Sequence, residues 1–242
     1  MTSTRLPGKI LLPILGRPMM AYQLQRLART RADELVLATT TNETDNPVAA
    51  LATSWGWRVT RGSEDDVLGR YVQAAGEVDA SVIVRSTADC PLIDPAIVDE
   101  GIERFAGVDY LAAMGLPDGM GFEVFSRALL ERLDADSTEP AEREHVTLRA
   151  YTHPEDYRIG GWEVTPDRSG QRWTVDTAED FEVVRRIITA LLPDKPRFTI
   201  EDVAEVMAQH PDWSAINAAV TQQYAQVTST LYERIRADAL HV

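Results

Sequence analysis

Residues 57–84 read WRVTRGSEDDVLGRYVQAAGEVDASVIV, and this stretch decides the fold class. The short runs at its two ends, 57–60 and 81–84, have the pattern of strands. A polar loop and a helical pattern over 67–75 separate them. Upstream, the same kind of reading predicts a helix, a strand and another helix over 19–29, 35–40 and 47–55. Strands that alternate with helices predict βαβ crossovers and a largely parallel sheet with helices on both faces.

The alternation of strands and helices becomes less regular towards the C-terminus. The pattern predicts further helices over 96–105, 127–133, 142–151 and 178–191. It predicts strands over 110–113, 122–125, 157–164 and 172–176. After a break with two prolines at 192–197, two more helices follow, over 200–209 and 213–240.

Charge is distributed unevenly along the 242 residues. The first 32 residues hold six basic side chains and no acidic one, whereas the remaining 210 hold 18 basic and 38 acidic side chains. The overall charge of −14 argues against a nucleic-acid-binding surface, which needs basic contacts to phosphates. The basic start instead predicts a local site for a small anion.

Other classes of protein are excluded by composition. A single cysteine, Cys90, fits a reducing compartment and no disulfide framework. No apolar run approaches the roughly 18 residues of a membrane span, and no signal-peptide pattern opens the chain. We therefore expect a cytoplasmic protein without a membrane partner. The four histidines lack zinc-ligand spacing, so any metal is expected to be oxygen-ligated magnesium.

Two aspartates follow predicted strands, at the edge where ligands collect in such sheets. Asp89 lies in the loop after Val84, and Asp176 ends the strand predicted over 172–176. Together they could hold one magnesium ion against a triphosphate. The alternative is that one caps a helix and the other pairs with an arginine such as Arg85 or Arg172. Nearby Asp94, before Pro95, is instead a predicted helix cap.

The N-terminal segment STRLPGK at 3–9, which carries part of the basic charge, could also be mistaken for a P-loop. Its Gly8-Lys9 pair is reminiscent of a P-loop, but Ser3 stands where the first glycine belongs and Ile10 replaces the Ser or Thr that would hold magnesium. We reject the P-loop, and a frayed, solvated terminus stays open as the alternative to an anion site. His145, in Glu142–His145, is by default a surface or supporting side chain.

Five motifs, in order, resemble the spore-coat-polysaccharide cytidylyltransferases related to CMP-KDO synthetase. They are STRLPGK (3–9), RGSEDDVLGRY (61–71), DCPLIDP (89–95), EHVT (144–147) and TVDTAED (174–180). The resemblance implies a Rossmann-like three-layer sandwich with a mostly parallel central sheet. It further implies a nucleotidyltransferase domain over 1–195, with a C-terminal helical extension over 196–242 packed on it.

The resemblance also implies a function and its residues. A magnesium-dependent enzyme would couple CTP to a small acidic acceptor, release pyrophosphate and form a homodimer. The nucleotide would be held by Ser3, Arg5, Lys9, Arg61, Ser63 and Arg70, with Arg5 and Lys9 catalytic. Magnesium would be held by Asp89 and Asp176. The acceptor would face Arg85, Glu123, Glu144 and His145.

Three departures from the family pattern qualify these expectations. The chain starts at the methionine of the first motif, so the family's first strand and an Ala-Arg pair are expected to be missing, or to be encoded upstream of Met1. Without them, Arg5 and Lys9 must be held in another way. Ala88 stands where a glycine is common. Gly121 replaces an aspartate of the acceptor loop, so the acceptor is either a KDO-like or nonulosonic sugar acid or a phosphonate or phosphorylated acid.

Two alternative functions remain open from the sequence. The first is a catalytically weak homologue that binds a nucleotide or a partner protein. The second is an enzyme that uses a nucleotide other than CTP.

Overall fold

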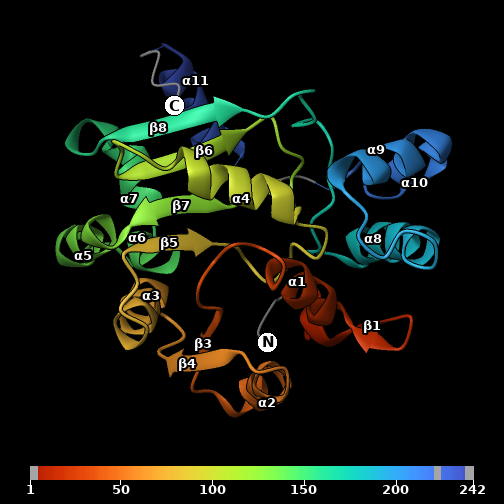
Figure 1. Ribbon diagram of the computed structural model, residues 1–242, viewed down its shortest axis with the longest axis horizontal. Coiled ribbons are helices and arrows are strands. Elements are labelled where there is room, and N and C mark those ends of the chain that lie inside the picture. The colour runs from red at the N-terminus through yellow and green to blue at the C-terminus, as the bar shows by residue number, and fades with distance from the viewer. Residues whose placement is uncertain (1–4, 221–224, 238–242) are drawn as a thin grey trace.

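The computed structural model describes residues 5–220 and 225–237, which include a central four-stranded sheet (Figure 1). Its order is β5 (Val82–Arg85), β7 (Glu123–Ser126), β6 (Tyr110–Met114) and β8 (Ile159–Glu163). β7 runs antiparallel to both of its neighbours, whereas β6 and β8 are parallel. Three of the four strands therefore point the same way, as predicted, and β7 is the exception.

Two smaller pairs of strands precede this sheet in the sequence. β3 (Val36–Thr40) and β4 (Arg58–Gly62) are parallel, with Val36 opposite Arg58. β1 (Pro13–Ile14) and β2 (Arg17–Pro18) form a hairpin that the sequence did not predict. The family's first strand, expected to be missing or to be encoded upstream of Met1, is not tested by the described residues, which begin at Arg5.

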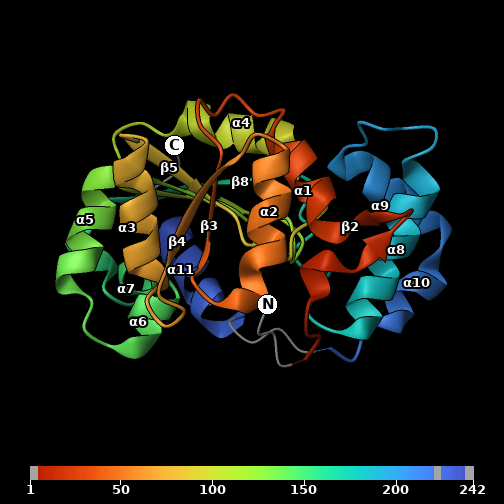
Figure 2. The ribbon, with the colours of Figure 1, turned by 90° about the horizontal axis from the view of Figure 1, so that it is seen from below.

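Helices cover both faces of the central sheet (Figure 2). β6 shows why, because its residues alternate between two cores: Leu111 and Ala113 belong to one, and Tyr110 and Ala112 to the other. The first core is covered by α1 (Met19–Leu27), α4 (Pro95–Arg104), α8 (Ala178–Leu191) and α9 (Ile200–Gln209). The second is covered by α3 (Val67–Glu77), α5 (Arg127–Asp136) and α11 (Ala225–Ala237).

Local capping explains where several helices begin. Asp66 accepts a hydrogen bond from the backbone N–H of Gly69 in α3, and Thr177 and Asp180 form a capping box on α8. Asp94 caps α4, as predicted, by accepting from Ala96, and its other oxygen accepts from the backbone N–H of Ile200 at 2.7 Å. One carboxylate thus serves the start of α4 and the start of α9.

The remaining helices are shorter. They are α2 (Asn46–Ser54), α6 (Pro140–Glu144), α7 (Leu148–Thr152) and α10 (Pro211–Ile216), with the 3₁₀ turns η1 (Lys9–Leu11), η2 (Glu43–Asp45) and η3 (Pro154–Asp156). The boundary proposed at residue 195 stays a prediction. Val203 and Val206 of α9 pack in the same core as β6.

Three predicted elements were wrong. The helix predicted over 142–151 is split into α6 and α7, because Val146 between them adopts a φ of 50°. No strand forms over 172–176: the backbone N–H groups of Trp173 and Val175 bond to loop carbonyls, those of Asp118 and Asp89.

The third is the long helix predicted over 213–240. It is interrupted, with α10 ending at Ile216 and α11 beginning at Ala225. The Asn217 side chain turns inward to donate hydrogen bonds to Arg172 and Asp180.

Candidate functional site

Lys9 joins three distant parts of the chain. Gly8 has a φ of 70°, and this left-handed residue starts the 3₁₀ turn that carries Lys9. The ammonium Nζ of Lys9 lies 3.1 Å from Asp89 Oδ2 and 2.9 Å from Asp176 Oδ1. Arg5 contacts the other oxygen of Asp176 at 3.1 Å. Arg5 and Lys9 are therefore held by ion pairs with the two carboxylates, and the sequence-predicted catalytic and metal-binding residues meet at one point.

These contacts keep Lys9 charged. Burial on its own lowers the pKa of Lys9, but the charges and hydrogen bonds of Asp89 and Asp176 outweigh it and hold that pKa above its ordinary value. Burial likewise raises the pKa of Asp176, yet its bonds to Lys9 and Arg172 bring the net pKa below the ordinary value. The site therefore holds an ammonium and a carboxylate at neutral pH.

Arg172 extends the group behind Lys9. Its guanidinium contacts Asp118, Asp176 and Asp180. Asp180 is fully buried and also accepts hydrogen bonds from Asn217 and from the backbone N–H groups of Asp176 and Thr177. We call the whole set the Lys9 cluster: Arg5, Lys9, Asp89, Asp118, Arg172, Asp176 and Asp180.

The Lys9 cluster has four carboxylates against three cations. Burial, followed by the charges of Asp176 and Asp89, raises the pKa of Asp118 above its ordinary value even though Arg172 opposes this. Among the residues that the structure describes, no three His, Cys, Asp or Glu side chains are grouped as metal ligands. Two carboxylates suffice for magnesium when phosphate oxygens and water complete the shell, so the excess negative charge and oxygen donors fit that ion.

A cavity of about 180 Å³ lies beside the Lys9 cluster. Its lining comes from the end of β5 and the strands and helices next to it: Arg85, Ser86, Thr87, Tyr110, Ala112, Gly121, Phe122, Glu123, Tyr151, Leu231 and Tyr232. We call it the Arg85 cavity. Thr87 connects it to the Lys9 cluster, because its hydroxyl donates to Asp89 Oδ1 at 2.5 Å.

Glu123 accepts hydrogen bonds from several side chains around the cavity. Its Oε2 accepts from Arg85 Nη1 at 2.6 Å, and its Oε1 accepts from the hydroxyls of Thr147 at 2.6 Å and Tyr110 at 3.1 Å. Tyr151 closes the network through contacts with both of these hydroxyls. Burial opposes the charge on Arg85, but Glu123 outweighs it and raises the pKa of Arg85. The pair is a preformed, hydrogen-bonded ion pair.

The other predicted nucleotide-binding residues do not belong to the Lys9 cluster. Arg61 is in β4, Ser63 follows that strand, and Arg70 is in α3. Arg61 donates to the carbonyls of Thr40 and Asn42 and to the Asn46 side chain, so it shapes that loop. Arg70 lies across Gly62, and its buried Nε has no hydrogen-bond partner in the described structure. Ser63 is exposed. Ser3 lies outside the described residues.

The predicted Glu144–His145 pair lies outside the lining of the Arg85 cavity. Burial, with a contribution from the nearby charge of Arg85 and against that of Glu144, lowers the pKa of His145. His145 is therefore close enough to sense the cavity's cation, whereas Glu144 is exposed at the end of α6.

Several site residues were missed from the sequence. The hydroxyls of Tyr110, Thr147, Tyr151 and Tyr232 face or support the Arg85 cavity. Thr147 belongs to the EHVT motif, which was a usable signal, but the tyrosines had none. Arg172 was considered only as a partner that would neutralise an aspartate, and it does pair with Asp176 at 3.0 Å.

Within residues 5–220 and 225–237, no helix is both long and apolar enough to cross a membrane.

Comparison with known proteins identifies the family. The family model described as cytidylyltransferase matches residues 1–232. The spore coat polysaccharide biosynthesis protein SpsF of Bacillus subtilis is 34% identical over 223 residues, which is 88% of this chain and 92% of that protein. A 3-deoxy-manno-octulosonate cytidylyltransferase of Geobacter sulfurreducens is 39% identical over 107 residues, 43% of this chain and 41% of that protein.

A solved structure agrees with these relatives. A cytidylyltransferase from Leptospira borgpetersenii superposes with a TM-score of 0.83 at 34% identity, and the match covers 88% of this chain and 92% of that one. Family model, sequence relative and structural neighbour all span most of the chain. The chain therefore belongs to the cytidylyltransferase family, in the spore-coat-polysaccharide type that is related to CMP-KDO synthetase.

Proposed function

We propose that the protein transfers CMP from CTP to a small acidic acceptor and releases pyrophosphate. One observation carries the proposal: the Lys9 ammonium lies between Asp89 and Asp176, and Thr87 links this cluster to the Arg85 cavity. A site for a triphosphate and a site for an acceptor therefore adjoin. Family membership supports the choice of cytidine nucleotide.

The triphosphate and the cytidine of CTP are each assigned to different residues. Arg5 and Lys9 bind the triphosphate, with Ser3 as an additional donor. The loop from Arg61 to Arg70 binds the cytidine: Arg61 fixes the Thr40–Asn46 segment, and Arg70 retains an unused Nε–H. Because Arg61 already has three partners, we assign it to shaping the loop rather than to a direct base contact.

Magnesium is the proposed cofactor, held by Asp89 and Asp176. When bound, it would neutralise charge on the phosphates and on the departing pyrophosphate. Lys9 contributes in the same sense, because its ammonium stays protonated and contacts both carboxylates.

The transfer needs positioning and charge neutralisation rather than a covalent intermediate. An oxygen of the acceptor forms a bond to the α-phosphorus, and the bond from that phosphorus to the pyrophosphate oxygen breaks. A hydroxyl acceptor gives its proton to water, and pyrophosphate leaves next to Arg5 and Lys9. Arg85 orients the acceptor on the other side of the reacting phosphorus.

The Arg85 cavity favours one type of acceptor. Its lining holds one cation, Arg85, and that charge is already paired with Glu123. Hydroxyl groups from Ser86, Thr87 and three tyrosines supply the remaining polar atoms. At roughly 30 Å³ per water, the volume corresponds to about six water molecules. These features support a compact, hydroxyl-rich acid with a single carboxylate over a phosphonate or phosphorylated acid, which brings more negative charge.

The proposal is tested by incubating the protein with CTP, magnesium and a panel of candidate acids. We expect mass spectrometry to detect a CMP conjugate of a sugar acid, with equimolar pyrophosphate. Parallel reactions with ATP, GTP and UTP should give much less product. CTP binding without pyrophosphate release for any acceptor would instead indicate a nucleotide-binding homologue.

A further inference from the structure

A second cavity, of about 300 Å³, lies between the C-terminal end of α1 and the connection from α8 to α9. We call it the arginine cleft. Its lining consists of Tyr22, Gln25, Arg26, Arg29, Leu192, Pro196, Arg197 and Phe198. None of these residues lines the Arg85 cavity or belongs to the Lys9 cluster.

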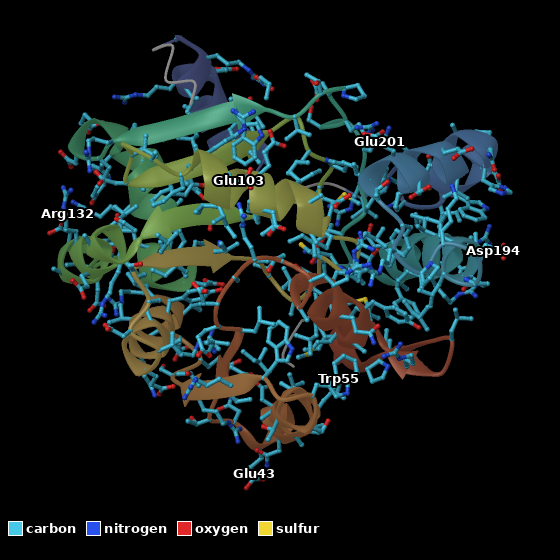
Figure 3. The ribbon with its side chains drawn as sticks, viewed as in Figure 1. Glu43, Trp55, Glu103, Arg132, Asp194 and Glu201 are labelled. Atoms are coloured by element: carbon cyan, nitrogen blue, oxygen red, sulfur yellow. The ribbon has the colours of Figure 1, made fainter. Side chains whose placement is uncertain are left out.

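The arginine cleft concentrates positive charge in an acidic protein. Three guanidinium groups line it, from Arg26, Arg29 and Arg197, and no carboxylate does. None of the three forms an ion pair with any residue that the structure describes. Asp94 lies near enough to act on Arg26, but its two oxygens accept hydrogen bonds from the backbone N–H groups of Ala96 and Ile200. Asp194, between the lining residues Leu192 and Pro196, is exposed beyond the end of α8 (Figure 3). In a chain with a net charge of −14, three unpaired arginines at one cavity need an explanation.

Arg26 is the buried floor of the cleft. Its Nε donates to the carbonyl of Ile93, its Nη2 donates to the carbonyl of Phe198 at 3.0 Å, and its guanidinium lies 4.2 Å from the centre of the Phe198 ring. Burial, with Arg29 adding to it and Asp94 opposing it, lowers the pKa of Arg26 to about 10. Arg26 remains a cation at neutral pH, and the carbonyls that hold it do not neutralise its charge.

The other two arginines are available to a ligand. The Nε of Arg29 is buried and has no hydrogen-bond partner in the described part of the chain. Arg197 is exposed at the rim. Arg26 is buried and Arg29 is half-buried, and neither forms an ion pair with a described residue. Because such cations are costly to bury, an anion in this cavity would lower the free energy of the folded protein.

We propose that the arginine cleft binds a small molecule that carries a phosphate group beside an apolar part. Guanidinium groups match the oxygens of a phosphate in charge and geometry, and two or three of them around one dianion form a strong site. The rest of the lining is largely apolar, from Tyr22, Leu192, Pro196 and Phe198. The cleft is large enough for a small ligand with both chemistries.

The test measures binding of phenyl phosphate, inorganic phosphate and benzoate by calorimetry at constant ionic strength. We expect saturable binding of phenyl phosphate to the unaltered protein, with weaker binding of each of the other two probes. The double variant Arg29→Gln/Arg197→Gln should weaken phenyl phosphate binding at least tenfold. Arg197→Gln alone, at an exposed side chain where substitutions usually change stability little, should weaken it several-fold.

Two controls separate this site from others. Arg132→Gln removes a charge from an exposed arginine on the opposite side of the molecule and should not change binding (Figure 3). Lys9→Ala should keep the affinity for phenyl phosphate, because the Lys9 cluster is a different anion site. Loss of binding in Lys9→Ala, or unchanged binding in the double variant, would overturn the proposal. Benzoate that binds as tightly as phenyl phosphate would exclude the phosphate class.

Discussion

The Lys9 cluster and the Arg85 cavity adjoin, but they hold their charges differently. Lys9 reaches two carboxylates that come from loops, and its contacts span 80 and 167 residues of sequence. Glu123 and Arg85 come from neighbouring strands and are opposite each other in the register of β5 and β7. The first arrangement joins separate segments, whereas the second belongs to the sheet itself.

This difference indicates whether the ion pairs of each region must rearrange when a ligand binds. A triphosphate that binds Lys9 must compete with Asp89 and Asp176, so nucleotide binding rearranges ion pairs. Glu123 already accepts three hydrogen bonds, and an acceptor would find Arg85 in a fixed orientation. We therefore expect changes in the Lys9 cluster to act on turnover, and changes in the Arg85 cavity to act on stability and acceptor affinity.

The largest effect is expected from Lys9→Ala. The variant loses the ammonium that would neutralise the leaving pyrophosphate, so turnover should fall by about 10²–10³-fold or more. Lys195, the other lysine of the chain, is half exposed and pairs with Asp202. Lys195→Ala is the matched control and should keep turnover. Pyrophosphate release is measured for both, and near-normal release from Lys9→Ala would remove it from the mechanism.

The next largest effect is expected from Glu123→Gln. It leaves Arg85 without its anion in a mostly buried position, at a cost of about 3 kcal/mol in the free energy of unfolding. The exposed pair of Arg127 and Glu131 offers a control, Glu131→Gln, which should cost much less because water screens this pair. Denaturant titration of both variants measures the difference. Equal costs would mean that the two regions do not differ as described.

The smallest effect is expected from Gly121→Asp. Gly121 lines the Arg85 cavity, and a Cβ built there meets no atom within 4 Å, so a side chain can start there without a clash. Its carboxylate restores the residue that the resemblance implies for the acceptor loop and could accept hydrogen bonds from the hydroxyls of a sugar acid. We expect it to lower the acceptor KM about tenfold, or roughly 1.4 kcal/mol. The KM for CTP should stay unchanged, and Gly121→Ala should behave like the unaltered protein. An equal change in both KM values would refute a role for position 121 that is specific to the acceptor.

Sequence reasoning succeeded where the pattern is local. The strands and helices from β3 to α4 follow from apolar periodicity, and Asp94 follows from its position before a proline. Asp89 follows β5, as the rule that ligands gather at strand ends predicts, but no strand precedes Asp176, so that rule placed Asp176 correctly for a wrong reason. The link of both aspartates to Lys9 followed from the family resemblance. Physical pattern alone did not single out Lys9 against a frayed terminus.

What was missed depends on distant contacts. Tyr232 reaches the Arg85 cavity from α11, and its hydroxyl lies 3.4 Å from the carbonyl oxygen of Ala113, which is 119 residues away. Nothing in the local sequence of a tyrosine indicates such a partner. The interruption of the last helix likewise depends on Asn217, whose partners are Arg172 and Asp180.

The span of the Lys9 contacts also has a consequence during synthesis of the protein. Translation adds Asp176 to the chain 167 residues after Lys9. A cluster with such separated members cannot form on a short nascent chain. A ribosome-bound fragment that ends before Asp176 would therefore lack part of the Lys9 cluster and would leave Lys9 with Asp89 alone of these two carboxylates.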